Sequence, residues 1–134
     1  MTRQVISSGV PLQQTHGYSR AVRVGAHVHV AGTAARGEAL AGNAYVQTQN
    51  ILGTIRSALE QAGARVEDVV RTVIYVTDID DAESVGRAHR EVFGDVRPTR
   101  RRDRTASAPH RASWQLPRLG LTGAKSTGIP ICSD

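Results

Sequence analysis

The side chains best suited to chemistry in this sequence are arginines that lie within eight residues of one another. They are Arg97, Arg100, Arg101, Arg102 and Arg104. Arg100 follows a predicted helix end at Gly94 and a proline, Pro98. A planar guanidinium can bind a carboxylate through two parallel hydrogen bonds, which suits it to hold an anionic ligand. The cluster therefore offers an anion-binding arginine; the alternative is a set of surface arginines with no ligand.

The positive charge is confined to the C-terminal part of the chain. The 134 residues carry a net charge of +5. Residues 1–96 hold nine Arg and ten acids, whereas residues 97–134 hold seven Arg and one Lys against two Asp. A uniformly basic domain would favour binding to nucleic acid. A near-neutral body with a basic end instead favours a solvated, disordered arm over an arm that binds nucleic acid.

Two groups of potential metal ligands have structural explanations. His27 and His29 fall on one face of a predicted strand, but no third ligand has a suitable spacing, so both are predicted to face solvent. The acids of segment 78–83 lack the longer ligand series and the central glycine of a calcium loop. Asp80 with Glu83 resembles a capping box at the start of a helix, where acids are favourable.

Composition predicts one soluble domain of ordinary size. Cys132 is the only cysteine, so no disulfide can form within the chain, which fits a reducing compartment. No signal peptide follows Arg3, and no apolar run approaches the ~20 residues of a membrane span. A cytoplasmic location is therefore expected. Phosphate-binding loops, dinucleotide-binding glycine motifs and the G-x-S-x-G motif are absent from the sequence.

Before residue 97 the chain predicts strands and helices in the order β-β-α-β-α. Strands are expected at residues 4–8, 22–30 and 69–76, and helices at residues 44–62 and 82–93. The strand at 22–30 rests on alternating valines, and the strand at 69–76 on a dense β-branched run. Apolar residues inside each helix indicate its buried face.

The predicted helix at 44–62 has one apolar face and one polar face, and it contains a glycine. Its expected buried face comprises Val46, Ile51, Leu52, Ile55 and Leu59, and its expected outer face comprises Gln47, Gln49 and Asn50. Gly53 weakens the helix by ~1 kcal/mol relative to Ala. We interpret it as a position where the helix backbone packs closely on a sheet.

After residue 97 no period is sustained. A strand can begin at Thr99, but the basic residues that follow suit an interior strand poorly. The segments 114–116 and 119–121 are brief apolar spots, and prolines interrupt the region. We therefore expect an α+β domain over residues 1–100 and a basic, irregular tail over residues 101–134.

Four stretches together resemble the RidA/YjgF-like reactive-intermediate (imine) deaminase family. They are G-Y-S-R-A-V-R-V-G at 17–25, V-H-V-A-G-T at 28–33, A-G-A with E-D-V-V-R-T between 62 and 72, and V-F-G with R-P-T-R between 92 and 100. The resemblance covers about residues 4–100. It implies a small mixed sheet, of the chorismate-mutase-like kind, with one face covered by two helices.

The resemblance also implies an activity. Members of the family form homotrimers with ligand clefts between adjacent subunits. They hydrolyse enamines and imines such as 2-aminoacrylate to 2-keto acids and ammonia, without a metal or an organic cofactor. By position, Arg100 would bind the substrate carboxylate and Tyr18 would line the cleft. The backbone at Ala31 and Gly32 would form another wall, and Gly86 would also face the substrate.

The sequence departs from the family at several positions. Family members often have Ser at the position of Ala31, Asn at that of Gly86 and a large aromatic residue at that of His89. The acidic last strand, of the V-E-I-E kind, is expected to be missing or atypical. Two interpretations of the tail stay open, namely an aberrant, frameshifted C-terminus and a divergent extension.

Three functions follow from these observations. The first is hydrolysis of small imino acids. The second is binding of a small metabolite without catalysis, which Ala31 and Gly86 favour. The third is an action on RNA, because the family also carries a ribonuclease label and the C-terminal segment is basic; the near-neutral body ranks it last.

Overall fold

The computed structural model describes residues 2–104 and 112–120, with side chains described for residues 2–102. Its strands are β1 (Arg3–Ile6), β2 (Ala21–Val24), β3 (His27–Ala34), β4 (Arg71–Val76), β5 (Thr99–Arg104) and β6 (Ala112–Gly120). Its α-helices are α1 (Pro11–His16), α2 (Ala44–Gln61) and α3 (Ala82–Phe93). Short 3-10 turns lie at Gly37–Ala41, Val66–Asp68 and Ile79–Asp81.

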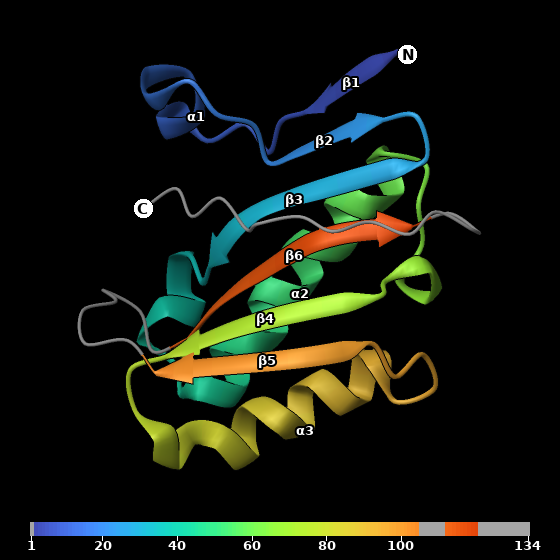
Figure 1. Ribbon diagram of the computed structural model, residues 1–134. Coiled ribbons are helices and arrows are strands. Elements are labelled where there is room, and N and C mark those ends of the chain that lie inside the picture. The colour runs from blue at the N-terminus through green and yellow to red at the C-terminus, as the bar shows by residue number, and fades with distance from the viewer. Residues whose placement is uncertain (1, 105–111, 121–134) are drawn as a thin grey trace.

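The strands form one mixed sheet in the order β1-β2-β3-β6-β4-β5. Only β4 and β5 are parallel among the described strand pairs, because helix α3 connects them as a crossover. Figure 1 shows α2 passing behind the sheet and α3 lying beside β5. The predicted α+β fold, a small mixed sheet with two helices on one face, is confirmed.

The core lies between the sheet and the two helices. Buried side chains on the sheet include Val28, Val30, Ile74 and Val76, and those on the helices include Ile51, Ile55, Leu59, Val85 and Phe93. Burial of each large aliphatic side chain contributes about 1.5–3 kcal/mol, so this layer supplies the main stabilisation. It fixes α2 and α3 against the strands that carry the candidate site residues.

The expected single strand at 22–30 is wrong, because the chain makes a hairpin there. Val24 pairs with His27, so Gly25 and Ala26 form a two-residue loop. Gly25 has φ 58°, a conformation that glycine adopts without strain at the first position of such a loop. The alternation of valines continues across the turn and hides it. Of the two histidines, His29 is exposed as predicted and His27 is half-buried.

A last strand is present and atypical, which is one of the two outcomes expected. Strand β6 lies at the centre of the sheet, between β3 and β4, and is antiparallel to both. Its sequence is atypical, since it includes Pro117 and lacks the acidic pattern. Strand β5 starts at Thr99, as the sequence allowed, and its arginines are accommodated because it is an edge strand. The segments 105–111 and 121–134 lie outside the described residues.

The helix boundaries agree with the prediction, but the predicted capping box of α3 and part of the predicted buried face of α2 do not. Helix α3 begins at Ala82 and ends at Phe93, as expected. No Asp80–Glu83 capping box forms; instead, the Asp78 carboxylate accepts a hydrogen bond from the Asp80 backbone N–H. In α2, Gln47 is buried and Val46 is 39% exposed, the reverse of the prediction. Gln47 is buried because its amide donates to the carbonyls of Leu40 and Gly42.

Candidate functional site

Arg100 lies at the start of β5, on the helix-covered side of the sheet. It pairs with Thr72 in the parallel register, so the two side chains share a face. Thr72 faces α3, where its hydroxyl lies 3.0 Å from Nε2 of His89. Arg100 is exposed, and its Nη1 lies 3.8 Å from the position that a Cβ on Gly86 would occupy. The missing side chain at Gly86 therefore leaves one side of the guanidinium open.

His89 forms the floor beside Arg100. It is buried, and its ring centroid lies 4.8 Å from that of Phe93. Burial, and secondly the positive charge of Arg100, lower the pKa of His89 to about 4. The imidazole is therefore neutral near pH 7, so Arg100 is the group next to it that carries positive charge. This arrangement suits recognition of an anion at Arg100.

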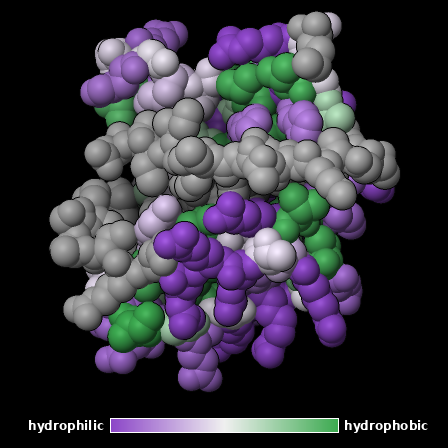
Figure 2. Space-filling model, in the orientation of Figure 1, coloured by the Kyte–Doolittle hydropathy of each residue, from purple (hydrophilic) through white to green (hydrophobic). Residues whose placement is uncertain are grey.

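The outer surface of α3 next to Gly86 is hollowed. A depression of about 290 Å³ is lined by Glu83, Ser84, Gly86, Arg87 and Arg90. The Arg87 guanidinium stacks over the ring of Tyr45 at 4.1 Å, so part of this wall is fixed by α2. In Figure 2, hydrophilic side chains gather over the part of the molecule that contains β5 and α3.

Tyr18, Ala31 and Gly32 come together at the other part of the sheet, through a residue that the sequence analysis missed. Arg20 donates from Nη1 to the carbonyl of Gly32 at 2.9 Å, and its own carbonyl accepts from the Ala31 N–H at 2.9 Å. The Tyr18 side chain lies close enough to Arg20 to favour its charged form. Arg20 is 1% exposed. It therefore holds Ala31 and Gly32 in place and lies next to Tyr18.

The electrostatics of Arg20 are unusual. Burial, and secondly the nearby positive charge of Arg36, lower its pKa, while the contact with Tyr18 opposes the shift. Thr33 accepts a further hydrogen bond from Arg20 Nη1, at 3.1 Å. Among residues 2–102 the ion pair present is Arg65 with Asp68, so neither Arg20 nor Arg36 meets a carboxylate in that part of the chain. No spacing in the sequence signals this burial.

The two groups of predicted site residues do not meet within one copy of the chain. Gly32 is on β3 and Arg100 is on β5, and strands β6 and β4 lie between them. Three strand spacings correspond to about 14 Å. Arg100 and Gly86 thus form one cluster, and Tyr18, Ala31 and Gly32 form another.

The described residues also limit two other possibilities. Across residues 2–104 and 112–120, no three His, Cys, Asp or Glu side chains are grouped so that they could hold a metal ion. Within the same ranges, no helix has the length and apolar character needed to cross a bilayer.

Comparison with known proteins places the chain in a family. The family model described as Endoribonuclease L-PSP matches residues 9–123. The chain belongs to the YjgF/RidA family. The match continues beyond residue 100, where the resemblance was expected to end, and it includes strand β6.

Individual relatives agree with this assignment. An uncharacterized protein of Streptomyces coelicolor is 41% identical over 96 residues, which cover 69% of this chain and 72% of the relative. A RutC family protein of Pyrococcus abyssi is 32% identical over 104 residues, covering 75% of this chain and 82% of the relative. The crystal structure of a YjgF/YER057c/UK114 family member from Mycobacterium tuberculosis has a TM-score of 0.82 and 37% identity. It is matched over 90% of this chain and 100% of its own.

Proposed function

We propose that this YjgF/RidA family chain hydrolyses small enamine and imine acids, such as 2-aminoacrylate, to 2-keto acids and ammonia. Arg100 would hold the substrate carboxylate. One observation carries the proposal: the Arg100 guanidinium is exposed beside Gly86, and it makes no ion pair with the side chains described for residues 2–102. An unpaired guanidinium next to a residue without a side chain has room for a bidentate carboxylate.

The proposed reaction needs few catalytic groups from the protein. An enamine such as 2-aminoacrylate first takes a proton from solvent at C3, which gives the iminium; an imine gives the same kind of cation when its nitrogen is protonated. The iminium carbon is electrophilic, and water adds to it with loss of a proton. The resulting carbinolamine expels ammonia and leaves the 2-keto acid. The protein contributes by fixing the carboxylate, orienting the water and excluding bulk solvent. Arg100 would fix the carboxylate, and the Tyr18 hydroxyl would hydrogen-bond to the water or the substrate.

The separation of the two clusters supports an active site shared between copies. A small imino acid held by Arg100 on β5 is too short to reach Gly32 on β3 across about 14 Å in the same copy. If a neighbouring copy presents Tyr18, Ala31 and Gly32 to Arg100, all five predicted residues face one substrate. We therefore propose a homotrimer in which each cleft is formed by the Arg100 cluster of one copy and the Tyr18 cluster of the next.

The test is ammonia release from freshly generated 2-aminoacrylate, measured above the spontaneous rate. Arg100→Ala is expected to reduce the rate to the spontaneous level, and Arg100→Lys to retain a small part of it because a lysine cannot bind the carboxylate bidentately. Arg101→Ala is the matched control, since it removes the same charge from the opposite face of β5. Unchanged turnover in the folded Arg100→Ala protein would remove the assignment.

A second candidate is binding of a small carboxylate metabolite without turnover. Ala31 has no side-chain hydroxyl, such as a serine would supply, and Gly86 has no side-chain amide, such as an asparagine would supply. The described site therefore offers few side chains to position a water. Calorimetry with pyruvate, the product of 2-aminoacrylate hydrolysis, separates the two functions. Pyruvate binding that requires Arg100, in a protein that does not accelerate ammonia release, would establish the binding function instead.

A further inference from the structure

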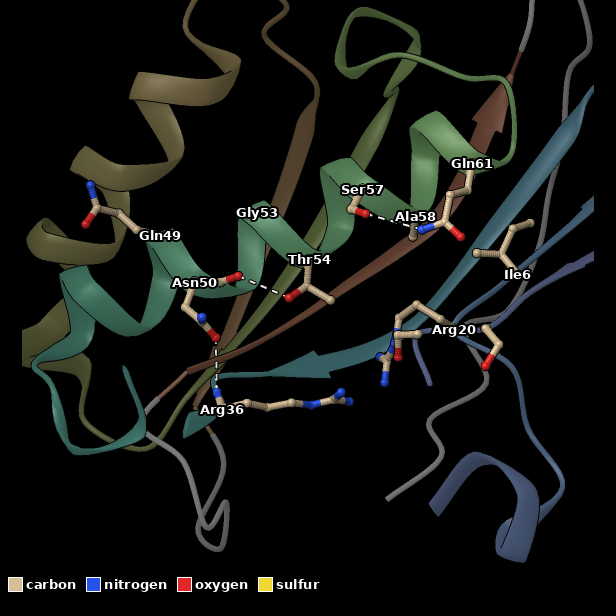
Figure 3. A pocket seen from close by; sticks show the side chains of 12 residues that line it. Ile6, Arg20, Arg36, Gln49, Asn50, Gly53, Thr54, Ser57, Ala58 and Gln61 are labelled. Atoms are coloured by element: carbon tan, nitrogen blue, oxygen red, sulfur yellow. Dashed lines mark hydrogen bonds between the residues drawn. The ribbon is translucent and has the colours of Figure 1, made fainter. Parts of the chain in front are cut away.

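A groove of about 600 Å³ runs along α2, away from the Arg100 cluster. One wall is the outer surface of α2, including Asn50, Gly53, Thr54 and Ser57. Figure 3 shows Arg20 and Arg36 across from this wall. The lining residues that the structure describes include serine, threonine and amide side chains but no Asp or Glu. The groove is therefore polar, open and positively charged.

The two arginines bring their positive charges close together without a described counter-charge. Arg20 is buried and tied by hydrogen bonds to Gly32, Thr33 and Ser8. The Arg36 backbone N–H donates to Asn50 Oδ1 at 3.0 Å, and its side chain extends along the groove toward Arg20 in Figure 3. The Arg36 guanidinium makes no hydrogen bond or ion pair with residues 2–102. Like charges at short range are unfavourable unless an anion joins them.

We propose that this groove is a binding site for a phosphate group, held between Arg20 and Arg36, with any attached polar body lying along α2. A compact dianion can meet two converging guanidinium groups at once, whereas a single carboxylate carries half the charge. The hydroxyls of Thr54 and Ser57 and the amide of Gln61 would face the remainder of the ligand. This site shares no residue with the Arg100 cluster. Arg20 also supports the Tyr18 cluster of the proposed hydrolase cleft, so the tests below change Arg36 and Gly53 and leave Arg20 in place.

Gly53 gives the groove its open wall. Gly53 lies at an exposed position of α2, and a Cβ added there would meet no described atom within 4 Å beyond the adjacent helix backbone. The earlier interpretation, that Gly53 allows close packing on the sheet, is therefore wrong. A side chain introduced at residue 53 would project into the groove rather than into the core.

The first experiment measures binding of inorganic phosphate to the full chain by calorimetry at constant ionic strength. Arg36→Ala is expected to weaken phosphate binding about tenfold or more, because a charge-assisted contact is lost. Arg56→Ala is the matched control: it removes the same charge from an exposed position of α2 that does not line the groove. Equal affinity in the two variants would overturn the location of the site.

A second pair of variants tests the groove without removing an arginine. Gly53→Glu places a carboxylate in the groove, and Gly53→Gln places an uncharged side chain of the same length there. Gly53→Glu is expected to lose phosphate binding, whereas Gly53→Gln is expected to weaken it by a smaller factor. Phosphate binding that is unchanged in Gly53→Glu, with the fold intact by circular dichroism, would overturn the proposal.

The ligand class is tested with other anions. Phosphate is expected to bind more tightly than succinate, and both more tightly than acetate. Succinate binding as tight as phosphate binding would overturn the phosphate assignment. Ribose 5-phosphate distinguishes the two sources of the group: tighter binding than phosphate assigns the groove to phosphorylated metabolites, and equal binding assigns it to free phosphate.

Discussion

Arg20 and Arg100 lie on different parts of one sheet and use the same side chain differently. Arg20 precedes β2, is 1% exposed, and donates hydrogen bonds to Ser8, Gly32 and Thr33. Arg100, on the edge strand β5, is exposed and lies beside Gly86 and neutral His89. Burial and hydrogen bonds through Nε and Nη1 thus fix the first guanidinium in place at the edge of the groove. The second guanidinium is exposed and has no such bonds to the described side chains, so it can adjust to a ligand.

The sharpest test of this difference is to remove each guanidinium in turn. Arg20→Ala is expected to lower the free energy of unfolding by about 2–4 kcal/mol, because it leaves buried acceptors unpaired and opens a cavity. Arg100→Ala is expected to change it by no more than about 0.5 kcal/mol, as is usual for an exposed side chain. Urea unfolding at one fixed protein concentration measures both. Similar losses in the two variants would contradict the distinction.

The sequence indicated these two arginines unequally. Arg100 belongs to a dense cluster at the end of a recognisable motif, so it could be selected from the sequence. Arg20 lies in a segment of ordinary composition, and its burial depends on acceptors from β3 and from the loop before α1. Such long-range pairing leaves no periodic pattern, so neither Arg20 nor the groove next to it could be predicted.

The same reasoning explains which elements could be predicted. Helix α3 and strand β4 have strong local patterns, and their positions agreed with the prediction. Strand β6 has a weak pattern and contains Pro117. Its place between β3 and β4 is set by pairing with residues far away in the chain. Short helix α1, which begins at Pro11, was not expected either.

The titration of His89, which lies beside Arg100, predicts how the stability of the protein depends on pH. Its folded pKa of about 4 lies below the ordinary value of 6.5, so the unfolded chain binds more protons between these pH values. The associated stability is therefore complete above pH 6.5 and is lost as the pH falls toward 4. We expect a loss of about 1–3 kcal/mol over this range, after allowance for solvent screening.

The measurement is unfolding free energy as a function of pH for the natural chain and for His89→Phe. The variant retains an aromatic ring beside Phe93 and should lack the His-dependent slope, whereas carboxylates titrate alike in both proteins. Because the charge of Arg100 also lowers the pKa of His89, Arg100→Ala should raise that pKa and shorten the pH range of the slope from its acidic end. Parallel pH profiles for the natural chain and His89→Phe would contradict this account.

The smallest effect concerns the groove beside Arg20. Gly53→Ala is expected to stabilise the protein by about 0.5–1 kcal/mol, because alanine restricts the unfolded chain and favours the helix. Outside the adjacent helix backbone, the described residues place no atom within 4 Å of the added Cβ, so they impose no steric cost on this gain. Thermal unfolding measures the gain. Ser57→Ala, on the same face of α2, is the control, because it makes that face less polar without replacing a glycine.

The same variant also bears on the phosphate site. If Gly53→Ala stabilises the fold and weakens phosphate binding, the absence of a side chain at residue 53 serves access of the ligand to the groove. Destabilisation by Gly53→Ala would instead mean that the groove is narrower than its open wall indicates, which would also remove room for a phosphate beside Arg36.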